Sequence, residues 1–151
     1  MTRYSYKAKA PKAYQALLDL ETHVRGAGFA PGFLDLVYLR VSQLNGCAFC
    51  VDMHSKDLRA AGEKPERIDC LPAWKETPYY SPSERAALRW AEAVTRLGPD
   101  GVDDATFAEA RQFFEEGPLA ELTLAVATIN AWNRLGIAFR SPAGVYQPKA
   151  S

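Results

Sequence analysis

Apolar residues recur every three or four positions along most of the chain, and this spacing is the feature that most limits its fold. A period of this kind places one face of a helix against a core. The segment from Pro11 to Arg25 shows it clearly, with apolar side chains at Ala13, Ala16, Leu17, Leu20 and Val24. We find no convincing alternation of apolar and polar residues, which is the pattern of a half-buried strand. The sequence therefore predicts an all-α fold.

Glycine, proline and capping residues mark the expected helix boundaries. Ser81-Pro-Ser-Glu84 combines an N-cap serine, a first-turn proline and the glutamate of a capping box. The tail from Ser141 has the composition of a loosely held end. The helices are expected over residues 11–25, 31–44, about 47–61, 65–70, 82–97, 103 or 104 to about 117, and 119–139.

Length and charge restrict the possible classes of protein. The 151 residues, 48% of them hydrophobic, fit one soluble domain over residues 1–151, with about ten peripheral residues at each end. Because 18 basic residues balance 18 acidic ones, no electrostatic force favours a nucleic acid or an anionic membrane as partner. The sequence shows no apolar stretch of about 20 residues and no signal peptide at its start. We therefore expect a cytoplasmic protein without a disulfide framework, since three cysteines are an odd number.

The run Cys47-Ala-Phe-Cys50-Val-Asp-Met-His54 carries most of the functional information. Residues three and four apart share one helix face, so the two sulfurs and the imidazole are expected on the same side. Both sulfurs would lie in the first helical turn, where free N–H groups and the helix dipole favour a thiolate. His54, one turn beyond Cys50, can accept its proton. This pattern predicts a redox-active dithiol with an attendant base.

Two other interpretations of the same residues stay open. The cysteines and the histidine could simply pack in a helix hairpin, because cysteine is among the most buried residue types. A structural zinc ion could bind if Cys70 or Asp52 completed a ligand set with His54, although zinc sites usually use two spaced ligand pairs and only one pair is present. Otherwise Cys70 is expected to be an inert bystander. Trp132, Asn133 and Arg134 are candidates for lining a pocket or for core and subunit contacts.

The segment from Leu36 to His54 strongly resembles the alkyl hydroperoxidase D-like core of the carboxymuconolactone decarboxylase superfamily. Residues 81–92 and 129–135 are similar to later segments of the same small proteins, so the resemblance covers most of the chain. It implies a compact all-helical domain whose central helix hairpin carries the Cys-x-x-Cys-x-x-x-His motif. It also implies a homo-oligomer, as a dimer, trimer or hexamer.

The resemblance assigns roles to individual residues. Cys50 would attack a peroxide and become a sulfenic acid, Cys47 would donate a proton and then close a Cys47–Cys50 disulfide, and His54 would belong to the proton relay. The family has a glutamate twelve residues before the first cysteine, where this chain has the shorter Asp35.

The hairpin geometry indicates independently what Asp35 can reach. If the helices fold back about Gly46, His54 lies opposite Tyr38, and Asp35 lies about 4.5 Å further along the axis. Asp35 can then reach His54, directly or through water, but not the sulfurs. The alternative is that Asp35 is a solvated acid in a first helical turn, where acids are favoured.

The expected function is therefore a thiol-dependent antioxidant peroxidase or disulfide reductase that acts on hydroperoxides. The resemblance implies no bound cofactor or metal, an external dithiol reductant such as a lipoyl group, and a lipoyl protein or a peroxiredoxin as redox partner. Two alternatives belong to other classes. One is the superfamily's cofactor-free lactone decarboxylase, which needs acid–base residues around a polyanionic substrate. The other is a non-catalytic module, zinc-stabilised or purely structural, that forms oligomers.

Overall fold

Helices account for the regular secondary structure of the computed structural model, which describes residues 1–148. No strand occurs within this range, so the prediction of an all-α fold is confirmed. Along the chain the elements are α1 (Tyr6–Lys9), α2 (Pro11–Arg25), α3 (Phe33–Asn45), α4 (Ala48–Ala60), α5 (Pro65–Asp69), the 3-10 helix η1 (Leu71–Glu76), α6 (Pro82–Thr95), α7 (Asp104–Arg111) and α8 (Glu116–Phe139).

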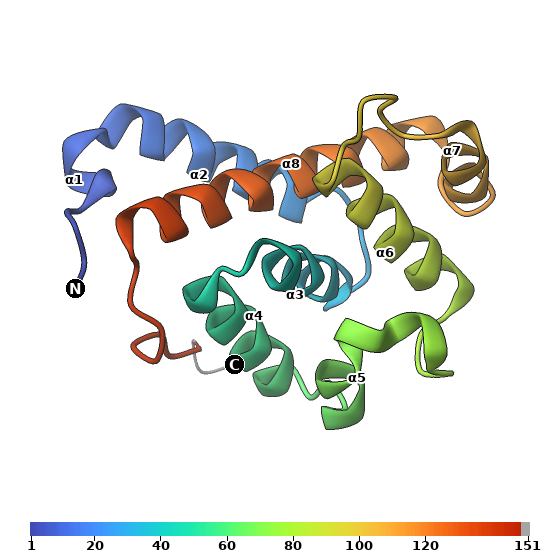
Figure 1. Ribbon diagram of the computed structural model, residues 1–151, viewed down its shortest axis with the longest axis horizontal. Helices are drawn as coiled ribbons and strands as arrows, with labels where there is room; N and C mark the ends of the chain where they lie inside the picture. Colours follow the sequence, from blue (N-terminus) through green and yellow to red (C-terminus); the bar gives the residue numbers. More distant parts are fainter. Residues whose placement is uncertain (149–151) are drawn as a thin grey trace.

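Helix α3 is the centre of the fold, with α4, α6 and α8 packed around it (Figure 1). This position explains the broad apolar surface of its sequence, because a helix covered on most sides buries residues all round. Seven of its residues are buried, namely Leu34, Leu36, Val37, Tyr38, Leu39, Val41 and Ser42. The α3–α4 hairpin is thus the central hairpin that the sequence predicts.

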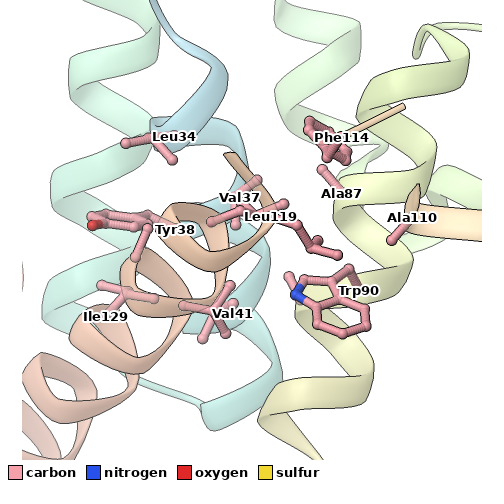
Figure 2. Close-up of a cluster of buried hydrophobic side chains, with 14 of the residues drawn as sticks. Leu34, Val37, Tyr38, Val41, Ala87, Trp90, Ala110, Phe114, Leu119 and Ile129 are labelled. Atoms are coloured by element: carbon pink, nitrogen blue, oxygen red, sulfur yellow. The ribbon is translucent and has the colours of Figure 1, made fainter. Parts of the chain in front are cut away.

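Two apolar clusters hold the helices on either side of α3. The larger cluster joins α2, α3, α6, α7 and α8, and Figure 2 shows Val37, Val41, Trp90 and Leu119 among its members. The smaller cluster fills the space between α3, α4, η1 and α6, and it contains Leu39, Leu58, Trp74 and Leu88. Because both clusters include side chains of α3, the position of this helix is fixed from opposite faces.

Several helix boundaries differ from the prediction for local reasons. Helix α3 begins at Phe33 rather than Pro31, because Gly32 takes a left-handed conformation (φ 78°) that a helical residue cannot adopt. Helix α8 begins at Glu116, before the expected Leu119, because a proline is tolerated in the first turn. The capping box of α6 is confirmed: Ser81 accepts from the backbone N–H of Glu84, and the Glu84 carboxylate accepts from that of Ser81.

Both chain ends contact the helices at a few points. The backbone N–H of Arg3 donates to the carbonyl of Phe139, and the ring of Tyr6 packs on that of Phe139. Beyond α8 the chain descends to α4 (Figure 1), where the N–H of Gly144 donates to Asp52. The expected tail also includes residues 149–151, which lie outside the described residues.

No helix within residues 1–148 combines the length and the apolar character needed to cross a membrane.

Candidate functional site

The turn between α3 and α4 places the two cysteines. Gly46 ends α3 in a left-handed conformation (φ 70°), which lets the chain reverse in a single residue. Cys47 follows as the extended N-cap of α4, and only Cys50 lies within the first turn. The prediction that both sulfurs lie in the first turn is therefore wrong for Cys47. The two sulfurs are joined in a disulfide, with Cα atoms 5.3 Å apart.

Helix α8 covers this disulfide through Gly136. A Cβ atom at position 136 would lie 3.0 Å from Cys47 Sγ and 3.6 Å from Cys50 Sγ, so a side chain there would force the Cys47 sulfur or the helix to move by a few tenths of an ångström. Sequence reasoning missed this residue, although a signal was present: a glycine inside a helix costs about 1 kcal/mol relative to alanine and usually has a packing reason. Both cysteines are almost completely buried beneath it.

His54 lies where the hairpin geometry predicts it. Its ring meets that of Tyr38 edge to face, with centroids 5.3 Å apart, which confirms that the two residues face each other. Nδ1 of His54 is 3.4 Å from Oδ1 of Asp35, too far for a good hydrogen bond. Neither ring nitrogen has a hydrogen-bond partner within residues 1–148, and only 1% of the residue is exposed. Asp35 therefore reaches His54 as a neighbouring charge.

A hydrogen bond from Arg25 helps to lower the pKa of Asp35. Arg25 Nη2 on α2 donates to Oδ1 of Asp35 at 2.9 Å. Burial disfavours the charged carboxylate, but the adjacent His54 ring and the Arg25 guanidinium outweigh this effect and lower the pKa of Asp35 to about 2. The alternative that Asp35 is a solvated first-turn acid does not hold, because its side chain is only 21% exposed and is engaged by Arg25.

Glu21 connects α2 to the same site. Its carboxylate accepts from Arg25 Nε, from the Tyr38 hydroxyl at 3.3 Å and from Trp132 Nε1 at 3.3 Å. Burial and the Glu21 charge together raise the pKa of Tyr38 well above its usual range. Sequence reasoning missed Glu21 and Arg25 because they stand on an ordinary amphipathic helix with no motif around them.

A cavity of about 690 Å³ opens beside these groups. Cys50 and His54 line it, whereas Cys47 is not among the described residues that do. Six of its sixteen lining residues are aromatic, and the wall includes residues from both chain ends. The aromatic lining residues are Tyr6, Tyr14, Tyr38, Phe49, Trp132 and Tyr146, and the charged ones are Glu21, Arg25, Asp35 and Asp57.

The other sequence candidates separate into different surroundings. Trp132 lines the cavity, but Asn133 is fully buried, donating to Ser42 and accepting from Asn45. Arg134 folds back onto Asn130 at the surface. Of the three adjacent residues, Trp132 therefore lies in the cavity wall, Asn133 in the core and Arg134 on the surface.

The structure does not assemble the zinc set considered from the sequence. Asp52 pairs with Lys56 and with the N–H of Gly144, and Cys70, a free cysteine after α5, does not line the cavity that holds His54. The residues of metal-ligating type that do come together are Asp35, His54 and Asp57.

Comparisons with known proteins find a matching family and a similar protein. Residues 11–93 match the Carboxymuconolactone decarboxylase family. The uncharacterized protein YdfG of Bacillus subtilis is 40% identical over 136 residues, which span 90% of this chain and 92% of YdfG.

Two solved structures extend the comparison. A protein of unknown function from Agrobacterium tumefaciens, described as a candidate antioxidant defence protein AhpD, superposes with a TM-score of 0.91 at 39% identity, covering 97% of this chain and 100% of that one. The debrominase Bmp8 superposes with a TM-score of 0.77 at 21% identity, covering 91% of this chain and 74% of its own. The likeness to Bmp8 is one of fold alone, and it shows that proteins of this fold differ in chemistry.

Proposed function

The chain belongs to the carboxymuconolactone decarboxylase family, with an AhpD-like fold, and on this premise we propose that it is a thiol-dependent peroxidase acting on hydroperoxides. One observation carries the proposal. Cys50 and His54 line the same cavity while Cys47 lies behind Cys50 beneath Gly136, so a substrate entering the cavity meets Cys50 first. This order matches an attacking Cys50 and a resolving Cys47.

The proposed cycle begins with the reduced cysteines. His54 accepts the proton of the Cys50 thiol, and the thiolate attacks the O–O bond of the hydroperoxide. The bond breaks, Cys50 becomes a sulfenic acid, and the leaving oxygen takes a proton and departs as an alcohol or water. The Cys47 thiol then attacks the Cys50 sulfur, releasing water and forming the disulfide. An external dithiol, such as a dihydrolipoyl group, returns both cysteines to thiols.

Asp35 supports this cycle as a positioning residue. Because its pKa is about 2, it stays ionised at neutral pH, 3.4 Å from Nδ1 of His54. A fixed negative charge there stabilises the positive charge that His54 acquires when it takes a proton, as the carboxylate does in other acid–His–nucleophile groups. The missing methylene relative to the family's glutamate does not keep Asp35 away from the histidine.

The charge of the cavity argues against the lactone decarboxylase alternative. Three carboxylates, those of Glu21, Asp35 and Asp57, line it against the single guanidinium of Arg25. A polyanionic substrate would be repelled by this wall, whereas a neutral hydroperoxide would not.

The proposal includes a cytoplasmic setting, a lipoyl protein or peroxiredoxin as partner, and assembly into a homo-oligomer. Phe107 of α7 and Leu124 and Ile137 of α8 are each more than two-fifths exposed and are therefore available for subunit contacts.

A peroxide-consumption assay with a dihydrolipoyl donor tests the proposed function. Wild type and Cys70→Ser should turn over at similar rates, while Cys50→Ser and Cys47→Ser should lose turnover. A sulfenic-acid trap should label Cys47→Ser, which retains Cys50, and should fail to label Cys50→Ser at either remaining cysteine. Equal turnover in all four proteins, or trapping at Cys47, would refute the proposal.

A further inference from the structure

Three side chains at the mouth of the α3–α4 hairpin form a cluster that the proposed peroxidase cycle does not fully use. His54 and Asp57 stand three residues apart on one face of α4, and Asp35 faces them from α3. One ligand atom from each lies within 4.8 Å of the other two. Three atoms bound at about 2.1 Å to one tetrahedral ion lie about 3.4 Å apart. Side-chain adjustments of less than about 1 Å would therefore bring all three onto one ion.

The state of His54 is the second, independent observation. The imidazole is 99% buried, yet both of its nitrogens lack a hydrogen-bond partner within the described part of the chain. A buried polar group without a partner is costly, so such a group usually has a functional reason. His54 lines the cavity, which gives an incoming ligand access to its ring.

The surrounding charge favours a cation. Not counting His54, the three lining carboxylates and one guanidinium leave two negative charges on the cavity wall. Arg25 is the only lining residue among 1–148 that opposes a cation, and Glu21 as well as Asp35 accepts its hydrogen bonds. Asp57 accepts one hydrogen bond, from the Tyr146 hydroxyl at 2.7 Å, which leaves acceptor capacity on its carboxylate.

We propose that Asp35, His54 and Asp57 form a binding site for a divalent transition-metal ion. One imidazole and two carboxylates suit ions such as Zn²⁺, Mn²⁺ and Co²⁺. Three protein ligands leave coordination positions open toward the cavity, as in sites where a metal also binds water or a small molecule. The cysteines are not part of this ligand set.

The site has a regulatory consequence, which rests on the proposed function. A neutral imidazole that holds a metal ion on one nitrogen carries its proton on the other. His54 with a bound metal ion therefore cannot accept the Cys50 proton, and peroxide turnover slows. Removing the ion with a chelator restores the rate.

Titration of the disulfide form with Co²⁺, followed by its visible absorption, tests the binding. In this form the Cys47 and Cys50 sulfurs are bonded to each other and do not compete as thiolates. Wild type should bind one equivalent without a thiolate charge-transfer band, and Asp57→Asn should bind about tenfold or more weakly. Asparagine keeps an acceptor for Tyr146, and far-UV circular dichroism checks that the variant is folded.

Asp52→Asn is the matched control, because Asp52 is a carboxylate on the same helix but is held by Lys56 and Gly144. It should bind Co²⁺ like wild type. The inference is overturned if no saturable binding is seen, if Asp57→Asn equals wild type, if Asp52→Asn loses as much, or if Cys70→Ser abolishes binding.

Turnover assays keep this inference separate from the proposed function. Loss of metal-free turnover in the cysteine variants tests the peroxidase proposal alone. For the metal site, the turnover of each protein with Co²⁺ is divided by its own metal-free turnover. This ratio should fall more for wild type and Asp52→Asn than for Asp57→Asn. Equal slowing of all three would contradict the site even if the peroxidase activity is real.

Discussion

Gly136 of α8 lies against Cys47 so closely that a Cβ atom at position 136 would be 3.0 Å from the sulfur. The two residues are 89 positions apart, and only the packing of α8 on the α3–α4 hairpin brings them together (Figure 1). The contact seals the cysteine pair from one side and leaves Cys50 to face the cavity.

Replacing Gly136 with alanine should therefore destabilise the protein. The added methyl group must displace the Cys47 sulfur or shift α8 by a few tenths of an ångström. Such overpacking typically costs about 1–3 kcal/mol, which exceeds the gain of up to about 1 kcal/mol that alanine has over glycine in a helix. Urea denaturation of the disulfide form measures the change. Gly117→Ala is the control in the same helix, because nothing lies within 4 Å of a Cβ there, and alanine should raise stability by up to about 1 kcal/mol. Similar effects of the two substitutions would contradict the assigned contact.

Asp35 should affect turnover through its charge. Asp35→Asn removes the negative charge next to His54 and should lower kcat/KM by about tenfold or more, with a changed pH profile. Asp35→Glu keeps the charge and introduces the residue expected from the family pattern, so it should retain most of the activity. The measurement is peroxide turnover between pH 5 and about 9. A purely structural role predicts equal losses in both variants and an unchanged pH profile.

Asn133 should contribute to stability from inside the core. Its side chain donates to Ser42 at 3.0 Å and accepts from Asn45 at 2.9 Å, which joins α8 to the end of α3 just before Cys47. Asn133→Ala leaves the buried Ser42 hydroxyl without this donor and should cost about 1–3 kcal/mol in the free energy of unfolding. The neighbouring Arg134→Ala changes an exposed residue and should stay within about 0.5 kcal/mol of wild type. A loss in Arg134→Ala as large as that in Asn133→Ala would show that this network is not the cause.

Glu92 should make stability depend on pH in the acid range. Burial disfavours its charge, but Trp74, Lys75 and Arg40 more than compensate and lower the pKa of Glu92 below the ordinary value of 4.5. A lowered pKa gives stability that is present above pH 4.5 and is lost as the pH falls through the folded-state value. Glu92→Gln should thus be less stable than wild type by about 1–3 kcal/mol at neutral pH. The two unfolding free energies should converge as the pH falls below 4.5, and a constant difference would contradict this account.

Features that depend on neighbours along the chain could be predicted from the sequence. The capping box at Ser81 and the extent of α2 follow from local backbone chemistry. The face-to-face position of Tyr38 and His54 follows from counting residues on either side of Gly46, because a tight turn fixes the register of the two helices. The proximity of Asp35 to His54 follows from the same count.

Features that depend on distant segments could not be predicted in this way. Trp132 donates to Glu21 across 111 residues, and Tyr146 donates to Asp57 across 89. Their sequence surroundings carry no signal, since an acid or an arginine on an amphipathic helix is usually a solvated residue. The prediction for Cys47 is also wrong, because a shift of one residue in the start of α4 moves a side chain from the first turn to the N-cap.

The sequence by itself determined the helical fold and the proximity of Cys47, Cys50 and His54, because helix period and turn position are set by neighbouring residues. Only the tertiary structure decided that α2, α8 and the segment after Phe139 enclose Cys50 and His54 in a cavity with excess negative charge. The physical reason is that cavity shape, burial and the pKa of Asp35 arise from side chains that meet only when distant helices pack. The cysteine motif thus supplies the reactive groups, and the packing of the whole chain sets what can reach them.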